Sequence, residues 1–266
     1  MRPYLALFRA RFRALLQYRA AALAGFGTQL FFGIIRTMIL GAFYASSTGG
    51  ARPMTLAEAI SYVWLGQAFF YLLPYSANPD PDVRDMIRTG QVVYELARPL
   101  DLHSLWLSRA LAARVAPTMM RALPMFLVAI PFFGMTLPPS WPAGLAALVA
   151  IAMAALLTAA FATVITATLM WTTSGEGIAR ILPSLVMIGS GMVVPLPLFP
   201  DWAQPLLTAL PFRGMADDPF RIYLGLLPPG AVLAVLARQG AWTLALVLLG
   251  RGLVARGQRR LVLQGG

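Results

Sequence analysis

Six stretches of predominantly apolar residues, each about 20 residues long, limit what this chain can fold into. They are Ala21–Tyr44, Leu56–Leu73, Leu111–Phe133, Ala143–Trp171, Ile181–Leu198 and Ala231–Gly250. A helix of roughly 20 apolar residues crosses the hydrocarbon core of a bilayer, which is about 30 Å thick. Charged residues make up only 12% of the chain, about half their share in soluble domains. We therefore predict an all-α membrane protein with six transmembrane helices in a single domain over residues 1–266.

Two of these stretches allow other interpretations. The first resembles a signal peptide, but its apolar region is longer than the roughly 7–15 residues of such peptides, so we predict a retained span. The last contains Arg238 and could instead form a short surface helix followed by a shorter span.

The polar residues exclude several kinds of chemistry. All 21 basic residues are arginine, so the chain lacks the phosphate-binding lysine of a Walker-type ATPase. It has no cysteine and a single histidine, His103, which excludes disulfides, thiol nucleophiles and the usual zinc sites. We therefore expect no catalytic residue, no metal and no cofactor in this chain. The net charge of +11 could indicate nucleic acid binding. Arginine clusters in an apolar chain are more typical of membrane flanks, so we predict no nucleic-acid partner.

The arginines are distributed unequally between the two sides of the predicted membrane. One side holds fifteen of them: Arg2, Arg9, Arg11, Arg13, Arg19, Arg84, Arg88, Arg98, Arg109, Arg114, Arg180, Arg251, Arg256, Arg259 and Arg260. The opposite loops hold Arg52, Arg213 and Arg221. Because arginine-rich short loops stay in the cytoplasm, we predict that both termini are cytoplasmic. The arginine- and alanine-rich composition suggests a high-GC bacterium, and hence its cytoplasmic (inner) membrane.

Residues 1–20 are predicted to form an amphipathic helix in the plane of the lipid headgroups. Its apolar stripe is flanked by arginines and consists of Leu5, Phe8, Phe12, Leu15 and Leu16. The helix is either a membrane-surface anchor alone or also a docking surface for a cytoplasmic partner.

The cytoplasmic loop over residues 75–110 contains its own helix signals. Asp80 can cap a helix that has Pro81 in its first position, and Gly90 can end it. The segment Gln91–Ala97 can form a second short helix, which Arg98-Pro99 must end. A solvated linker is one interpretation, and a contact surface for a cytoplasmic subunit is the one we favour.

Arg36 and Arg121 fall inside predicted spans. An arginine near the middle of a membrane costs at least about 2.5–3.5 kcal/mol, which makes lipid exposure unfavourable. Each either extends toward the headgroups or faces a polar pathway.

Residues 195–230 are apolar and aromatic but contain eight prolines: Pro195, Pro197, Pro200, Pro205, Pro211, Pro219, Pro228 and Pro229. They cannot form one spanning helix. We predict an extracytoplasmic re-entrant hairpin of short helices, either a structural lid or a gate.

Three motifs resemble the permease subunits of ABC transporters of the ABC type-2 exporter class. They are IRTGQVVYELARPLD (Ile87–Asp101), PLPLFPDWAQPLLTALPF (Pro195–Phe212) and the tail RRLVLQGG (Arg259–Gly266). The tail is similar to short-chain members of this class that are commonly encoded beside a second permease and an ATPase.

The resemblance implies partners and site residues. In this family two permeases, identical or homologous, pair in the membrane, and two ATP-binding subunits that carry ATP and Mg dock beneath them. It implies an ATPase-coupling region at Asp85, Arg88, Gln91, Tyr94, Glu95 and Arg98. Interfacial docking would involve Phe8, Arg9 and Phe12. The possible pathway or gate comprises Arg36, Arg121, Phe199, Trp202, Pro211 and Phe212. The implied function is ATP-driven export by alternating access of a lipid, glycan, peptide or drug-like molecule.

Two other classes remain open. An ion-coupled secondary transporter usually has acidic residues inside its spans, whereas the ten acidic residues here are predicted to lie in loops or at span ends, with no buried coupling acid. A membrane-embedded enzyme that acts on lipids would need an acid and a base, for which Asp101 and His103 are the candidates.

Overall fold

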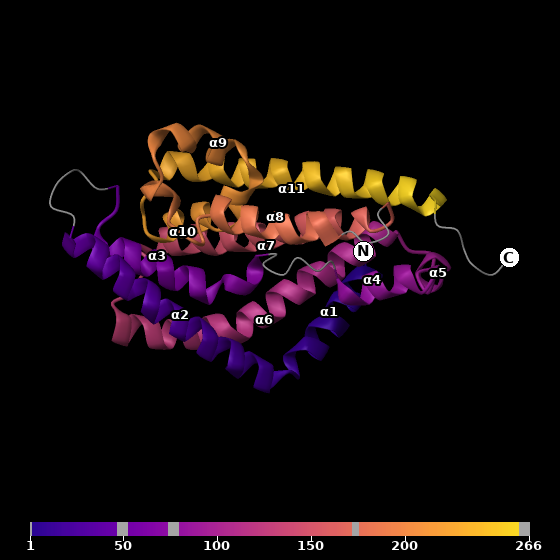
Figure 1. Cartoon of the computed structure of the whole chain (residues 1–266), viewed down its shortest axis with the longest axis horizontal. Helices are drawn as coiled ribbons and strands as arrows, with labels where there is room; N and C mark the ends of the chain where they lie inside the picture. Colours follow the sequence, from indigo (N-terminus) through magenta and orange to yellow (C-terminus); the bar gives the residue numbers. More distant parts are fainter. Residues whose placement is uncertain (1, 47–52, 74–79, 172–175, 261–266) are drawn as a thin grey trace.

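A computed structural model describes residues 2–46, 53–73, 80–171 and 176–260, and the elements within these ranges are all helices (Figure 1). The α-helices are α1 (Arg2–Leu16), α2 (Arg19–Ser46), α3 (Leu56–Ala68), α4 (Pro81–Arg88), α5 (Val93–Leu96), α6 (Leu102–Phe133), α7 (Trp141–Thr168), α8 (Glu176–Gly189), α9 (Gln204–Ala209), α10 (Asp217–Tyr223) and α11 (Pro229–Gly257). Short 3₁₀ helices are η1 (Phe70–Leu72), η2 (Leu196–Leu198), η3 (Asp201–Ala203), η4 (Pro211–Met215) and η5 (Gln258–Arg260).

Within the described ranges, four helices are long and apolar enough to cross a membrane: α2, α6, α7 and α11. The second and fifth predicted spans correspond to α3 and α8, which have 13 and 14 residues. Helix α3 is buried along most of its length, including Trp64 and Leu65. A helix enclosed by protein on every side does not need the length of one that faces lipid.

The third and the last predicted spans also differ from the helices observed. The third span begins at Leu102 rather than Leu111, because the Asp101 side chain caps the helix by accepting a hydrogen bond from the Ser104 amide at 2.8 Å. The last span is one continuous helix from Pro229 to Gly257, so the alternative of a separate surface helix is wrong. Arg238 lies within this helix.

Helix α7 is the central helix of the bundle. Of the 18 most apolar consecutive residues of α7, 61% are buried. The same share is 17% in α2 and in α11. Its many alanines, among them Ala147, Ala150 and Ala154, let neighbouring helices approach closely. Large apolar side chains such as Phe31, Leu127 and Leu248 instead point outward from α2, α6 and α11, as lipid-facing residues do.

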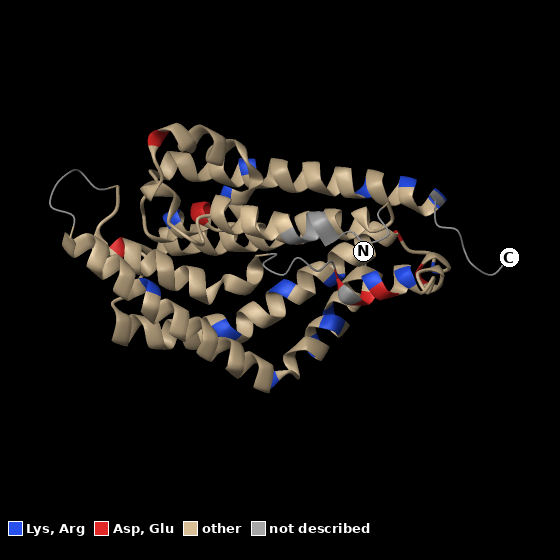
Figure 2. Cartoon of the chain, viewed as in Figure 1, with Lys and Arg blue, Asp and Glu red and all other residues tan. Residues whose placement is uncertain are grey.

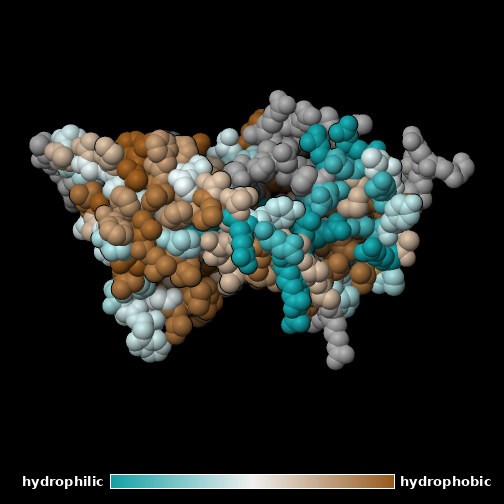
Figure 3. Space-filling model, turned by 90° about the horizontal axis from the view of Figure 1, so that it is seen from below, coloured by the Kyte–Doolittle hydropathy of each residue, from teal (hydrophilic) through white to brown (hydrophobic). Residues whose placement is uncertain are grey.

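The two ends of the long axis differ in character. At one end lie α1, α4, α5 and the C-terminal part of α11, and we call it the basic end because arginines gather there (Figure 2). At the other end lie η2, η3, α9, η4 and α10, which we call the hairpin end (Figure 1). On the face drawn in Figure 3, apolar surface covers much of the part away from the basic end, and hydrophilic surface is concentrated at the basic end.

Candidate functional site

At the basic end, α4 and α5 form a compact unit whose local signals are those of the sequence. The Asp80 carboxylate accepts a hydrogen bond from the Asp82 amide at 3.0 Å, and Pro81 occupies the first turn of α4. Gly90 has a φ of +74°, a left-handed conformation that favours glycine and turns the chain into α5. Val83 and Val92 are buried against the start of α6, so the unit is held to the bundle by apolar packing.

Glu95 connects this unit to α6 through polar contacts. Its side chain is only 4% exposed. Its Oε2 accepts a hydrogen bond from Trp106 Nε1 at 2.9 Å, and its Oε1 lies 2.7 Å from Arg109 Nη2 in an ion pair. A buried carboxylate held by two partners on one helix ties α5 to the first turns of α6.

Helix α1 is attached at the same place. The Asp101 amide donates a hydrogen bond to the Tyr4 hydroxyl at 2.8 Å, and Arg11 forms an ion pair with Asp82 at 2.7 Å. Phe8 and Phe12 stack with ring centroids 5.7 Å apart and are half-buried. Helix α1 therefore contacts both α4 and the start of α6.

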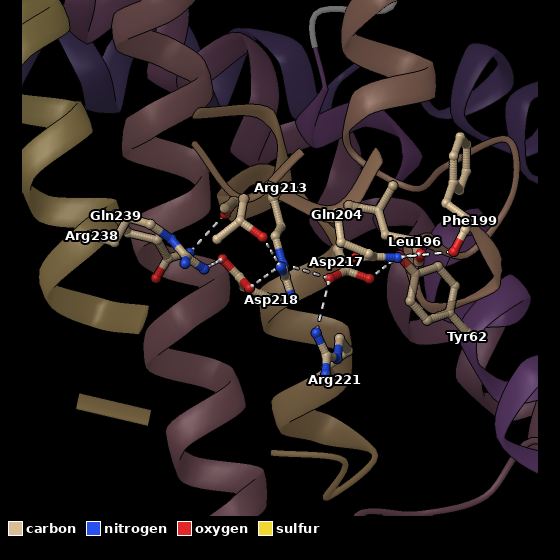
Figure 4. Close-up of polar contacts among 12 residues, drawn as sticks. Tyr62, Leu196, Phe199, Gln204, Arg213, Asp217, Asp218, Arg221, Arg238 and Gln239 are labelled. Carbon is tan, nitrogen blue, oxygen red and sulfur yellow. Dashed lines mark hydrogen bonds and ion pairs between the residues drawn. The ribbon is translucent and has the colours of Figure 1, made fainter. Parts of the chain in front are cut away.

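At the hairpin end, a group of charged side chains lies buried among apolar residues (Figure 4). Asp217 and Asp218, at the start of α10, are fully buried. Arg213 Nε lies 3.1 Å from Asp217 Oδ2 and 3.1 Å from Asp218 Oδ1. Arg238 Nη2, on α11, donates to Asp218 Oδ2 at 2.5 Å. We call these four residues, with Arg221 3.8 Å from Asp217, the charged network.

The charged network and the neighbouring Gln239 together join the hairpin to three other helices. Tyr62 on α3 donates a hydrogen bond from its hydroxyl to Asp217 Oδ1 at 2.9 Å. Gln239 on α11 donates from Nε2 to the carbonyl of Ala150 on α7 at 3.1 Å and to that of Gly214 at 2.7 Å. Burial raises the pKa of Asp217 to about 6, because the loss of hydration outweighs the attraction of Arg213 and Arg221.

The two intramembrane arginines of the prediction lie between α2, α3 and α6. Arg121 is 7% exposed, so it does not face lipid. Its Nη2 donates to the carbonyl of Ala21 at 2.9 Å, and its Cζ lies 3.9 Å from the centre of the Tyr71 ring. Arg36 is half-buried and donates from Nη1 to the carbonyl of Met192 at 2.6 Å.

Comparison with protein families gives one match. The model of the ABC-2 family transporter proteins matches residues 56–265. The chain belongs to this family. It is therefore a multi-pass membrane protein and an ABC transporter permease, as the three motifs predicted. Comparisons with curated proteins and with solved structures gave no significant match.

The six predicted coupling residues of this ABC-2 permease fall into two groups. Five are exposed at the basic end: Asp85, Arg88, Gln91, Tyr94 and Arg98. We call them the coupling surface. Glu95, by contrast, is buried and contacts α6. The two predicted short helices are confirmed, although α5 is shorter than Gln91–Ala97.

A helix is also confirmed at the N-terminus over Arg2–Leu16, shorter than the predicted 1–20, with Arg9 exposed. Tyr4 and Leu7 pack against the apolar cluster beneath α4 and α5, whereas Leu5 of the predicted stripe is exposed. Residues 75–79, Arg52 and the tail residues 261–266 lie outside the described residues.

The structure separates the predicted gate residues of the hairpin. Trp202 is 80% exposed, whereas Pro211 is buried. Phe212 packs edge-on against Phe161 with centroids 5.6 Å apart, and Phe199 packs against the small apolar cluster around Leu207. The predicted break-up of this segment into short helices is confirmed.

One sequence prediction about the acidic residues is wrong. Asp217 and Asp218 were expected in an outer loop, with no buried acid, and both are fully buried. The sequence did contain a pattern that indicates buried ion pairs. Arg213 and Arg221 stand four residues before and after Asp217 in an apolar stretch.

Asp101 and His103, the candidate acid and base of a lipid-modifying enzyme, do not form a hydrogen-bonded pair. His103 was expected on a loop, but it lies in the first turn of α6, is fully buried, and neither ring nitrogen has a hydrogen-bond partner. The Asp101 carboxylate bonds instead to Ser104.

Proposed function

We propose that this permease is the transmembrane subunit of an ATP-driven exporter that moves its substrate by alternating access. The observation that carries the proposal is the coupling surface, an exposed patch on α4 and α5 joined to α6 through the buried Glu95. Such a patch allows a cytoplasmic subunit to act on a membrane helix, because α5 and α6 are tied by an ion pair and a hydrogen bond.

The partners follow from the family and from what the chain lacks. ABC-2 permeases work with ATP-binding subunits, and this sequence contains no Walker lysine. We propose two ATP-binding subunits, which carry ATP and Mg, and a second permease, identical or homologous. The coupling surface would contact an ATP-binding subunit, and α1, with Phe8, Arg9 and Phe12, would contribute a second contact at the headgroup level.

We further propose six spans in the bacterial inner membrane, with both termini in the cytoplasm. Helices α3 and α8 would be the second and fifth spans, of which α3 is shortened because protein surrounds it. The concentration of arginine at the basic end supports this orientation (Figure 2). The hairpin end would then lie in the outer leaflet as a re-entrant hairpin, with Phe199, Trp202, Pro211 and Phe212 near the exit.

The substrate class is a lipid, glycan, peptide or drug-like molecule. An ion-coupled secondary transporter is less well supported, because the two buried acids of the hairpin are neutralised by arginines and lie on the short helix α10 rather than on a long spanning helix. A lipid-modifying enzyme lacks an assembled acid–base pair.

The test is co-purification with the ATP-binding subunit encoded beside this chain, in mild detergent, with wild type compared with Tyr94→Ala. Tyr94 is 71% exposed on the coupling surface. Trp141→Ala is the matched control, because Trp141 is 77% exposed but lies at the start of α7. We expect Tyr94→Ala to release the ATP-binding subunit and Trp141→Ala to retain it. Equal retention by both variants would reject the coupling surface, and the absence of any ATP-binding subunit from wild type would reject the exporter.

A further inference from the structure

Arg36 and Arg121 lie within long apolar helices and are unlike the arginines of the permease that pair with a buried carboxylate. Arg109 pairs with Glu95, and Arg238 pairs with Asp218. Among the described residues, no carboxylate forms an ion pair with Arg36 or Arg121. A guanidinium buried at membrane depth without a counter-ion is unfavourable and marks a place where an anion is bound or passes.

The guanidinium of Arg121 has unused hydrogen-bonding capacity. Its Nη1 donates to the carbonyl of Pro117 at 3.1 Å, in its own helix, and its Nη2 donates to that of Ala21. Its Nε is buried and has no hydrogen-bond partner. Both hydrogen bonds are to neutral carbonyls and the Tyr71 ring is also neutral, so no opposite charge balances the guanidinium.

Arg36 lies beside two buried amides. Gln29 and Gln67 are 5% and 1% exposed. The Gln67 amide is oriented so that it bonds to both Gln29 and Arg36. In this orientation the Gln67 side-chain nitrogen donates to Gln29 Oε1 at 2.5 Å, and the Gln67 side-chain oxygen accepts from Arg36 Nη1 at 3.3 Å. All the contacts of Arg36 are therefore to neutral oxygens on one side of the guanidinium, and its other nitrogens remain available.

These side chains follow one face of α2. Gly25, Gln29 and Gly33 are the buried positions of the middle of this helix, and Arg36 follows them less than one turn later. A Cβ at Gly25 would lie 2.5 Å from Arg121 Nε, so the absence of a side chain there is what admits Arg121 against α2. We call Arg36, Gln29, Gln67 and Arg121 the arginine seam. It runs along α2 where this helix meets α3 and α6, the two helices that carry Gln67 and Arg121.

We propose that the arginine seam binds the anionic headgroup, of phosphate type, of an amphipathic substrate. The Arg36 guanidinium, which lies beside both amides, supplies the charge-assisted hydrogen bonds, and the amides supply further donors and acceptors. Arg121, which contacts Ala21 nearer the start of α2, adds positive charge at a second point along the same helix. Outward-facing apolar residues on the same helix, such as Phe31, Phe32 and Met38, provide a surface for the acyl chains. This inference gives the substrate class of the proposed exporter and rests on that function for its biological meaning.

The experiment measures ligand binding to the purified full-length permease in an uncharged detergent, by isothermal titration calorimetry. The probes are dihexanoyl phosphatidylglycerol, dihexanoyl phosphatidylcholine and inorganic phosphate. The variants are Arg36→Gln, Arg121→Gln and the charge-retaining Arg36→Lys, with Arg256→Gln, an exposed arginine near the end of α11, as control. Arg36→Gln keeps the test valid if Arg121→Gln fails to fold.

We expect phosphatidylglycerol to bind and phosphatidylcholine not to bind. Arg36→Gln should weaken binding by at least about tenfold, because a charge-assisted contact is lost, whereas Arg36→Lys and Arg256→Gln should stay within about threefold of wild type. Phosphate that binds as tightly as the lipid, with the same arginine dependence, would support the site and identify a soluble anion as its ligand. Weaker phosphate binding would identify a lipid-type headgroup.

Two results would overturn the proposal: equal binding of both lipids, or unchanged phosphatidylglycerol binding in Arg36→Gln. Binding is measured without the ATP-binding subunit, so this failure is distinct from failure of the exporter. If the permease retains its ATP-binding subunit but does not distinguish the two lipids, only the headgroup proposal is rejected and the proposed exporter function stands.

Discussion

Replacing Asp218 by asparagine removes one carboxylate charge from the charged network while keeping the size of the side chain. Asp218 is fully buried and contacts Arg238 at 2.5 Å and Arg213 at 3.1 Å. At 2.5 Å the Coulomb attraction is roughly 7 kcal/mol with an effective dielectric constant of about 20. Most of this offsets the desolvation of the two ions, and breaking a buried pair by removing one partner costs about 3–5 kcal/mol.

The structure places Asp218→Asn near the lower end of this range. Arg213 keeps Asp217 as a partner, and Arg238 is partly exposed, so only one of the two arginines is left without a carboxylate. We therefore expect the free energy of unfolding to fall by about 3 kcal/mol. The assay is reversible unfolding in mixed detergent micelles, followed by tryptophan fluorescence.

The control is Asp201→Asn, an exposed carboxylate of the same hairpin, which should change the free energy of unfolding by less than about 0.5 kcal/mol. Arg238→Gln completes a double-mutant cycle. Because the two side chains are in direct contact, the losses should be non-additive by about 1–3 kcal/mol. The reasoning is refuted if Asp218→Asn is as mild as Asp201→Asn, or if the two losses simply add.

Three further predictions test other parts of the permease. Glu95→Gln removes the ion pair with Arg109 and should lower transport about two- to thirtyfold, the range for weakened coupling, while the ATP-binding subunit stays bound in a pull-down. Gly33→Ala places a Cβ 2.5 Å from Trp64 and should destabilise by about 1–3 kcal/mol, whereas Gly41→Ala, with nothing within 4 Å, should be neutral or stabilising in the same unfolding assay. The pKa of Asp217 is raised to about 6, so the folded state binds this proton at a higher pH than the unfolded chain. Stability should therefore increase as the pH falls from about 7 to 4, less so in Asp217→Asn.

Local signals made the basic end predictable. The start of α4 depends on Asp80 and Pro81, and its end depends on Gly90, all within a few residues of the helix they define. Helix α6 was predicted to begin at Leu111, which left Arg109 in the loop before it. The structure places Arg109 inside the helix, where it pairs with Glu95. Hydropathy alone does not distinguish a helical arginine with a partner from a loop arginine.

The charged network could be predicted only in part. The contacts of Asp217 with Arg213 and Arg221 follow from a spacing of four residues. The contact between Arg238 and Asp218 joins residues 20 apart, and that between Tyr62 and Asp217 joins residues 155 apart. Helix packing creates these contacts, and no local pattern encodes them. For the same reason the length of α3, which is buried by neighbouring helices, was overestimated from hydropathy.

Helix α6 connects the two ends of the permease and explains why a contact at one end can affect the other. Its first turns hold Glu95 through Trp106 and Arg109. Just past its last turn, the Thr136 hydroxyl contacts the Ser61 hydroxyl of α3 at 3.0 Å, and the Thr136 carbonyl accepts from the Tyr223 hydroxyl of α10 at 3.2 Å. Helix α6 is continuous from Leu102 to Phe133, although Pro117, Pro124 and Pro131 inside it each remove one backbone hydrogen bond. A displacement of α5 is therefore expected to reach α3 and α10 directly, without unfolding any element between them.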